Sequence, residues 1–269
     1  MDVDLYEVNA FSNRPLGGNP MGVVLLEEWL PSHTLQGMAS QTMTPVTAFV
    51  VRRGKVCEIR CFTAWRELAL NGSAVLASAA VIMDFYDRHQ RRVTFIHSRG
   101  EAEVWRQEGR LHLDLPQWRL RPRADSAPVL AALGVAQGEV WQGRDLVVVL
   151  ESREQVAALK PDFIRLARLP AALVVVTAAD QDSGYVLRAF SPSTGVCEDA
   201  ATATAHCALA PFWAARLGKS QLQAEQLSSR RANFTCELLG NRVVIESQVL
   251  QVRHKLLTLP REMTQPSSL

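Results

Sequence analysis

The chain has 269 residues, of which 48% are hydrophobic and 21% charged, and its 29 Lys and Arg against 27 Asp and Glu give a formal net charge of +2. This composition is typical of a soluble globular protein and excludes disordered, collagen-like, coiled-coil and small disulfide-stapled chains. The near balance of charge gives no reason to expect nucleic acid or an anionic membrane as a partner. The length fits one large domain or two lobes.

The cysteines and the apolar stretches indicate a cytoplasmic protein without a membrane segment. The first four residues include Asp2 and Asp4, where a signal peptide would carry Lys or Arg. The apolar stretches 68–83 and 200–215 are shorter than the roughly 20 residues needed to cross a bilayer. The five cysteines are an odd number without a CxxC pair, which predicts reduced thiols. They are Cys57, Cys61, Cys197, Cys207 and Cys236.

The first part of the chain alternates strands and helices. Asn71 is a good N-cap, and the Ala-rich run after it suits a helix that is buried on all sides. An antiparallel meander follows, with turns at Arg99-Gly100 and Glu108-Gly109. In chain order we predict strands at 5–11 and 22–26, a helix at 31–40, a strand at 46–51, a helix at 71–85, and strands at 94–98, 101–107 and 110–115.

The second part repeats this scheme after a Pro- and Arg-rich linker at 116–123. A helix is predicted from Asp199 to the stop signal Leu217-Gly218, with a kink at Pro211. A hairpin is predicted around Gly240-Asn241. The predicted strands lie at 146–150, 173–176, 185–190, 234–238 and 243–247, and residues 265–269 form a frayed tail.

The chain contains a near-copy of itself. Ile59-Arg-Cys-Phe-Thr reappears as Leu187-Arg-Ala-Phe-Ser, 128 residues later, and the same spacing places Asn71 on Asp199. Several matches in register predict two lobes of similar construction. We expect an α+β fold with an N-terminal lobe at 1–117, a C-terminal lobe at 118–262 and a tail at 263–269. Each lobe should be a barrel-like, mostly antiparallel sheet around a central buried helix.

Two matched helix openings also suggest a binding site. If a pseudo-two-fold axis relates the lobes, the N-termini at Asn71 and Asp199 can both point into the cleft between them. A helix N-terminus carries unpaired N–H groups and a partial positive charge. The cleft would then favour a small anionic metabolite such as a carboxylate. The alternative is that both residues are plain N-caps.

Several motifs over nearly the whole chain resemble those of phenazine-biosynthesis PhzF-like proteins, relatives of diaminopimelate epimerase. The resemblance implies two similar lobes with the site between them, cofactor-free proton transfer at carbon, no metal, and a homodimer. The run from Glu198 to Lys219 is the most specific part. The motifs are Ala10-Phe-Ser, Gly18-Asn-Pro, Thr47-Ala-Phe-Val, Ile59-Arg-Cys-Phe-Thr followed by Glu67, Phe190-Ser-Pro, Glu198-Asp, Ala205-His-Cys-Ala-Leu-Ala-Pro-Phe-Trp and Leu217-Gly-Lys.

The sequence departs from this family at the positions that carry the chemistry. The family's general acid/base glutamate lies in Ser-Glu-Thr-Ala-Phe, which here begins Pro45-Val46, so Val46 occupies the glutamate position. The family's Cys-Gly-His opening reads Asn71-Gly72-Ser73, and the second opening keeps Asp199 but has Ala203 for Gly and Thr204 for Ser. The resemblance thus implies Asp199 as a catalytic candidate, with Val46 and Ser73 at substituted catalytic positions. The implied substrate-binding residues are Asn19, Asn71, Gly72, Ser73, Asp199, Ala203 and Thr204.

Three functions remain open from these residues. The first is an isomerase or epimerase whose acid/base chemistry runs through Asp199, with His206 or Glu198. The second is a pseudoenzyme that binds a small anion, and the third is an interaction protein that uses the fold as a scaffold. His206 is either a packed core histidine or a proton carrier of the pocket. A two-thiol mechanism lacks its thiols, since Cys197 has no counterpart near Asn71, and Cys57 with Cys61 are buried thiols or, alternatively, zinc ligands.

Overall fold

The computed structural model describes residues 1–69, 71–98, 100–180 and 184–259. Its contacts divide the chain into two compact units, which are described separately below. Unit 1 contains Met1–Asp114 and the residues from Ser247 onward, and unit 2 contains Leu115–Glu246. No helix within the described ranges is long and apolar enough to cross a membrane.

Unit 1 is one mixed sheet around a central helix. Its strands are ordered β17–β1–β2–β3–β4–β6–β7–β8, and β2/β3 and β4/β6 are the parallel neighbours. The short β5 pairs with β4. The elements are β1 (Asp2–Ala10), β2 (Asn19–Leu26), α1 (Ser32–Gln41), β3 (Val46–Arg53), β4 (Val56–Phe62), β5 (Glu67–Leu68), α2 (Gly72–Val81), a π-turn (Ile82–Tyr86), β6 (Arg92–His97), β7 (Gly100–Gln107), β8 (Arg110–Pro116) and β17 (Val249–Thr258).

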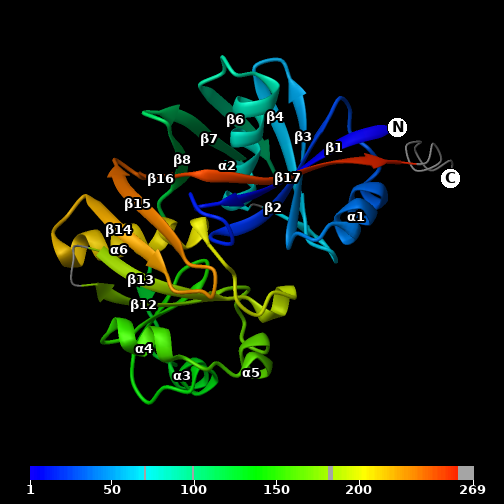
Figure 1. The fold of residues 1–269 in the computed structure, drawn as a ribbon. Helices are drawn as coiled ribbons and strands as arrows, with labels where there is room; N and C mark the ends of the chain where they lie inside the picture. Colours follow the sequence, from blue (N-terminus) through cyan, green and yellow to red (C-terminus); the bar gives the residue numbers. More distant parts are fainter. Residues whose placement is uncertain (70, 99, 181–183, 260–269) are drawn as a thin grey trace. The chain divides into compact units, whose positions relative to one another are not determined.

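Helix α2 forms the core of unit 1. All of its residues are buried, and it contacts β1, β2, β3, β6, β7 and β17 (Figure 1). Its Ala-rich sequence lets these strands approach on every side, because Ala adds little bulk beyond the backbone. This is the buried helix that the sequence predicts after Asn71.

The strands of unit 2 also pair in a mixed order, with helices on two faces. Its strands are ordered β9–β10–β11–β12–β13–β14–β15–β16, and β11/β12 and β13/β14 are the parallel neighbours. The elements are β9 (Arg121–Pro122), α3 (Ala127–Leu133), β10 (Glu139–Gln142), β11 (Leu146–Val149), α4 (Arg153–Ala158), α5 (Phe163–Ala167), β12 (Val174–Asp180), β13 (Gly184–Phe190), the 3-10 turns η2 (Pro192–Thr194) and η3 (Ala203–Ala205), α6 (His206–Leu217), β14 (Gln221–Gln226), β15 (Ala232–Leu239) and β16 (Arg242–Ser247).

Strand β12 shows how unit 2 fills both faces of its sheet. Val174 and Val176 belong to the core that α3, α4 and α5 cover. Thr177 faces the other way, where its hydroxyl accepts a hydrogen bond of 3.0 Å from the indole N–H of Trp213 on α6. Because side chains alternate along a strand, a run of apolar residues without alternation is needed to bury both faces.

The two units repeat one another in strand order. From β1 to β8 and from β10 to β16, the order of antiparallel and parallel neighbours is the same. Strands β4 (Val56–Phe62) and β13 (Gly184–Phe190) lie at the spacing read from the sequence. The duplication and the α+β class are therefore confirmed.

The second buried helix begins later than the sequence predicts. Residues Ala203–Ala205 form a 3-10 turn and the α-helix starts at His206, whereas a start at Asp199 was expected. The side chain of Gln226 holds the intervening segment, since its amide donates to the Asp199 carbonyl at 2.6 Å and accepts from the Thr202 N–H at 2.7 Å. These bonds occupy backbone groups that a helix would otherwise use.

The end of the chain also differs from the expected lobes. Strand β17 pairs with β1 and so belongs to unit 1, while the C-terminal lobe was expected to extend to residue 262 (Figure 1). The terminal amine of Met1 donates to the Leu259 carbonyl at 2.9 Å, which holds the first and last described residues together. The expected tail at 263–269 and Arg99 of the predicted turn lie outside the described residues.

Candidate functional site

Four of the residues assigned from the sequence meet at the opening of α2 in unit 1. Asn71 caps the helix, and its side-chain oxygen accepts a hydrogen bond of 2.9 Å from the N–H of Ala74. Asn19, at the start of β2, donates through its amide to the Ser73 hydroxyl at 3.4 Å. Asn19, Gly72 and Ser73 are all buried. The opening thus carries neutral hydrogen-bonding groups on a helix N-terminus.

Val46 starts β3 and is 5% exposed. Its side chain offers no hydrogen bond and no titratable proton. The residues around it form a hydroxyl cluster that sequence reasoning missed: the Thr42 and Thr47 hydroxyl oxygens lie 2.8 Å apart, and the Thr44 hydroxyl donates to Thr42 at 3.2 Å. The signal in the sequence is the threonine-rich run 42–47.

A small pocket lies beside Asn71, lined among others by Cys61, Glu67 and His97. Its volume of about 40 Å³ accommodates water but no metabolite. Burial raises the pKa of the Cys61 thiol to about 12 and lowers the pKa of His97. A hydrogen bond from Arg60 lowers the pKa of Glu67. Cys61 is therefore a protonated thiol near neutral pH and supplies no thiolate nucleophile.

The other assigned residues lie at the opening of the second buried helix, in unit 2. Ala203 and Thr204 are buried, and the Arg144 guanidinium donates from Nη2 to the Thr204 hydroxyl at 3.3 Å. Asp199 lies ahead of the 3-10 turn and is half-buried; its carboxylate accepts a hydrogen bond of 2.8 Å from the Thr202 hydroxyl. The sequence predicts that this helix begins at Asp199, but Asp199 does not cap it.

Strand register shows which positions of the two units correspond. Val46 starts β3 and Val174 starts β12, and each has a parallel partner on the preceding strand. These partners are Met21 in unit 1 and Leu146 in unit 2. Because the strand order is the same in both units, the two partners occupy equivalent places.

Two residues before these partners, each unit places a donor side chain. The donor is Asn19 in unit 1 and Arg144 in unit 2, and each donates to a hydroxyl at its helix opening, namely Ser73 and Thr204. The two helix openings therefore correspond at Ser73 and Thr204. This pairing is shifted by three residues from the pairing of Asn71 with Asp199 that the sequence suggests. Arg144 is another residue near the assigned positions that sequence reasoning missed, since the register of β11 is needed to find it.

The remaining candidates have structural partners. Both carboxylate oxygens of Glu198 accept hydrogen bonds from Arg188, at 2.8 and 2.9 Å. His206 is completely buried, its Nδ1 lies 2.6 Å from the Tyr185 hydroxyl, and burial lowers its pKa to about 3. It is thus a packed, neutral core histidine. Cys197 is exposed, while Cys57 and Cys61 are buried thiols. No cluster of His, Cys, Asp and Glu suited to a metal occurs among the described residues.

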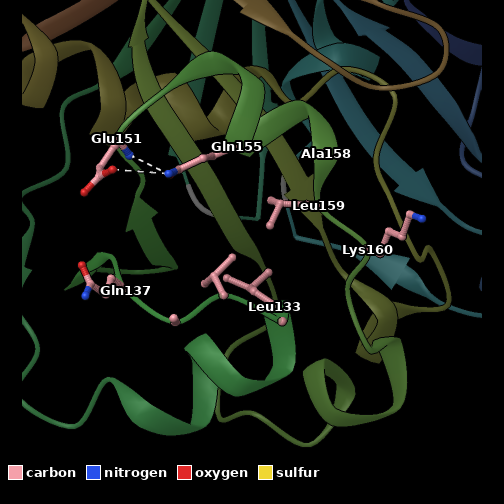
Figure 2. Close-up of a pocket in the computed structure, with 10 residues that line it drawn as sticks. Leu133, Gln137, Glu151, Gln155, Ala158, Leu159 and Lys160 are labelled. Atoms are coloured by element: carbon pink, nitrogen blue, oxygen red, sulfur yellow. Dashed lines mark hydrogen bonds between the residues drawn. The ribbon is translucent and has the colours of Figure 1, made fainter.

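Unit 2 also has a surface pocket of about 550 Å³ that none of the assigned residues line. It lies between the end of α3 and α4, with Leu133 and Leu159 on its apolar side (Figure 2). On its polar side Gln155 accepts from the Glu151 N–H at 3.1 Å and donates to the Glu151 carboxylate at 3.4 Å. Gln155 thus uses both its amide oxygen and its amide nitrogen on Glu151.

Comparison with known proteins places these features in context. The family model described as "Phenazine biosynthesis-like protein" matches residues 8–252. An uncharacterized isomerase of Pseudomonas aeruginosa is 42% identical over 94% of this chain and 97% of its own length. The crystal structure of a PhzF-family protein of Enterococcus faecalis superposes with a TM-score of 0.92 at 35% identity, covering 96% of this chain and all of that one. A hydroxyproline epimerase of Agrobacterium vitis shares the fold, with a TM-score of 0.63 at 12% identity over 98% and 94% of the two chains.

Proposed function

Because the chain belongs to the phenazine biosynthesis-like protein family, we propose that it is an isomerase- or epimerase-like protein for a small carboxylate metabolite, with the family's acid/base step altered or lost. The ligand would bind at the helix openings that carry Ser73 and Thr204. The helix dipole favours an anion at such openings. The relatives' isomerase description supports the reaction class.

The observation that carries this proposal is Val46. Its side chain is buried and apolar at the start of β3, where the family resemblance places the general acid/base glutamate. A proton transfer at carbon needs a group that accepts the proton and returns it. Valine cannot do either, and the threonine hydroxyls next to it do not ionise near neutral pH.

Asp199 is the one titratable side chain among the assigned positions. Oδ2 of its carboxylate accepts a hydrogen bond from the Thr202 hydroxyl. We propose that Asp199 anchors the ligand, for example through an amine or a hydroxyl, and that any remaining proton transfer at these positions runs through it. Cofactor-free chemistry is consistent with this donor set, which consists of hydroxyls, amides and one carboxylate.

Replacement of Val46 tests the proposal directly. A hydroxyanthranilate-type substrate is offered to the unmodified protein, to Val46→Glu, and to Val46→Glu with Ser73→His, and isomerisation is followed by absorbance. We expect turnover by the glutamate variants, and turnover by the unmodified protein that is absent or about 10²–10⁴-fold slower. Val46→Gln, whose side chain has the shape of glutamate without its acid group, is the control. A fully active unmodified protein that also tolerates Asp199→Asn would refute the proposal.

A second candidate function follows from the same valine, namely binding without catalysis. It is tested by deuterium exchange: carboxylates that raise the melting temperature are incubated with the protein in ²H₂O, and their C–H signals are followed by NMR. Exchange at carbon supports the isomerase. A stabilising ligand whose carbon-bound hydrogens stay unexchanged supports the pseudoenzyme.

The remaining expectations concern assembly and location. We propose a homodimer, as the family resemblance implies, and a cytoplasmic location, as the cysteine content and the acidic residues near the N-terminus indicate. Light scattering at micromolar concentration should give twice the mass of one chain, and a monomer mass would contradict the dimer. Fractionation of cells that express the protein checks its location.

A further inference from the structure

We propose that Arg144 is the residue that receives the carboxylate group of the substrate, together with the Thr204 hydroxyl at the helix opening of unit 2. This inference rests on the proposed function, because it assumes that the substrate is a small carboxylate. It adds the residue that would recognise the acid and assigns that group to unit 2.

The Arg144 guanidinium is held in place by a ring below it and by a carboxylate beside it. Its central carbon lies 3.9 Å from the centre of the Trp118 ring, over which it stacks. Nε and Nη2 both donate to one oxygen of Asp145, at 3.0 and 2.7 Å. Trp118 is itself fixed to α6, since its backbone N–H donates to the Cys207 carbonyl at 2.8 Å.

This arrangement leaves one edge of the guanidinium for a ligand. Nη2 also donates to Thr204, whereas Nη1 has no partner among the described residues. The side chain as a whole is 42% exposed. An arginine fixed by stacking loses little freedom when it binds, which favours its use in recognition.

The donors that remain fit a carboxylate. The Thr204 oxygen accepts from Arg144, so its own hydrogen is available to be donated to a ligand. Asp145 offsets the positive charge of Arg144, so recognition would depend on directed hydrogen bonds. A carboxylate accepts several such bonds in one plane.

The duplication indicates which unit takes the acid. The position equivalent to Arg144 is Asn19 in unit 1, a neutral side chain that is 2% exposed and donates to Ser73. One opening thus offers a guanidinium and the other an amide. The opening of unit 2 is thus the one that offers a charged donor to an acid.

Calorimetric titration with two probes tests the inference. The probes are 3-hydroxyanthranilate and its neutral amide, titrated into the unmodified protein and into Arg144→Met and Arg144→Lys. Loss of a charge-assisted hydrogen bond costs roughly 1.5–3 kcal/mol, or about 10- to 150-fold in affinity. We therefore expect Arg144→Met to weaken the acid by about this factor and to leave the amide unchanged. Arg144→Lys, which keeps the charge without the planar fork, should be intermediate and serves if the Met variant does not fold.

Arg216, near the C-terminal end of α6, provides a matched control for Arg144. Its guanidinium lies 4.2 Å from the centre of the Phe212 ring, pairs with Glu139 at 2.6 Å, and is 35% exposed. Arg216→Met should leave the affinity for the acid unchanged. Arg144 variants that bind the acid as tightly as the unmodified protein would overturn the inference and leave the proposed function standing.

The unmodified protein supplies the remaining outcomes. If it binds the acid and the amide equally, or binds neither at millimolar concentration, both the inference and the carboxylate substrate class fail. The isomerase activity would then still be decided separately by the exchange and turnover experiments of the proposed function.

Discussion

The cysteine side chains differ in their access to solvent, and this predicts their reactivity. Cys57, Cys61, Cys207 and Cys236 are buried, and burial raises their pKa values, in the case of Cys61 and Cys236 to about 12. Cys197 is exposed. We expect Ellman's reagent at pH 8 to react rapidly with one thiol in the native protein and with all five in urea. Cys197→Ser should remove the rapid phase, and a second rapid thiol in the native protein would contradict the burial described here.

His206 should make stability fall in acid. Burial holds its pKa at about 3, below its ordinary value of about 6.5. Below pH 6.5 the unfolded chain therefore binds a proton at this position that the folded chain does not bind. The free energy of unfolding loses about 1.4 kcal/mol per pH unit from this histidine as the pH falls from about 6 to 4.

Urea denaturation at several pH values measures this dependence. His206→Gln should reduce the slope relative to the unmodified protein. His89→Gln, which replaces an exposed histidine, is the control and should keep it. Parallel curves for the unmodified protein and His206→Gln would show that His206 does not contribute.

At the level of single residues, the sequence shows which catalytic side chains of the family are replaced. It does not show which residues contact the side chains that replace them. Val46 and Ser73 are visible as substitutions because identity alone decides whether a side chain can carry a proton. The pairs Asn19–Ser73 and Arg144–Thr204 are separated by 54 and 60 residues and meet through strand register. Register follows from packing over the whole sheet, which local patterns do not reveal.

The segment before the second buried helix depends on one buried glutamine, and this can be measured. Gln226 is completely buried and bonds to the Asp199 carbonyl, the Thr202 N–H and the Thr202 hydroxyl. Gln226→Leu leaves buried polar groups without partners, at about 1–3 kcal/mol for each. We expect a loss of about 2–4 kcal/mol in urea denaturation.

An exposed glutamine of the same strand is the matched control. Gln223→Leu in β14 should change stability by less than about 0.5 kcal/mol. Equal effects of the two replacements would mean that Gln226 does not hold the 199–202 segment. If Asp199 anchors the ligand, Gln226→Leu should also weaken binding of 3-hydroxyanthranilate, because Asp199 is no longer fixed.

The elements with strong local signals are predicted well, and the exception has a physical cause. Asn71 caps α2 where its sequence indicates, because a cap and the residue it bonds are neighbours in the chain. Asp199 has the same local signals, but Gln226 competes for the backbone groups near it. A partner from a distant strand thus overrides the local preference for a helix.

At the level of the whole molecule, the first and last described residues are bonded to each other, which predicts that the chain can be circularly permuted. Besides the bond from the Met1 amine, the Leu259 N–H donates to the Met1 carbonyl at 2.7 Å. A short Gly/Ser linker from Leu259 to Met1 would replace residues 260–269. New termini at the exposed turn Glu108-Gly109, where both residues have positive φ, avoid interrupting a strand.

This permutant should fold cooperatively, and thermal unfolding followed by circular dichroism measures it. A variant that ends at residue 246 is the counterpart, since it lacks β17 and leaves β1 without that neighbour. We expect the truncated chain to lose cooperative unfolding. A permutant that fails to fold would contradict the pairing of the two ends.

The duplication could be predicted from the sequence, whereas the presence of β17 in unit 1 could not. Repeats preserve spacing and residue type, so the segments around Ile59 and Leu187 are found by comparison of letters. The pairing of β17 with β1 joins residues such as Asp4 and His254, 250 positions apart. The sequence of a single extended strand carries little information about which distant edge it will join.

The split of unit 1 between the two ends of the chain sets the order in which the protein can be completed on the ribosome. Unit 2 is continuous, from Leu115 to Glu246, and has all its strands once that segment has emerged. The N-terminal 114 residues, although made first, wait for β17. At roughly 5–20 residues per second that delay is on the order of 10 s. During this time the edge of β1 lacks its partner, which is the condition under which nascent strands aggregate or recruit chaperones.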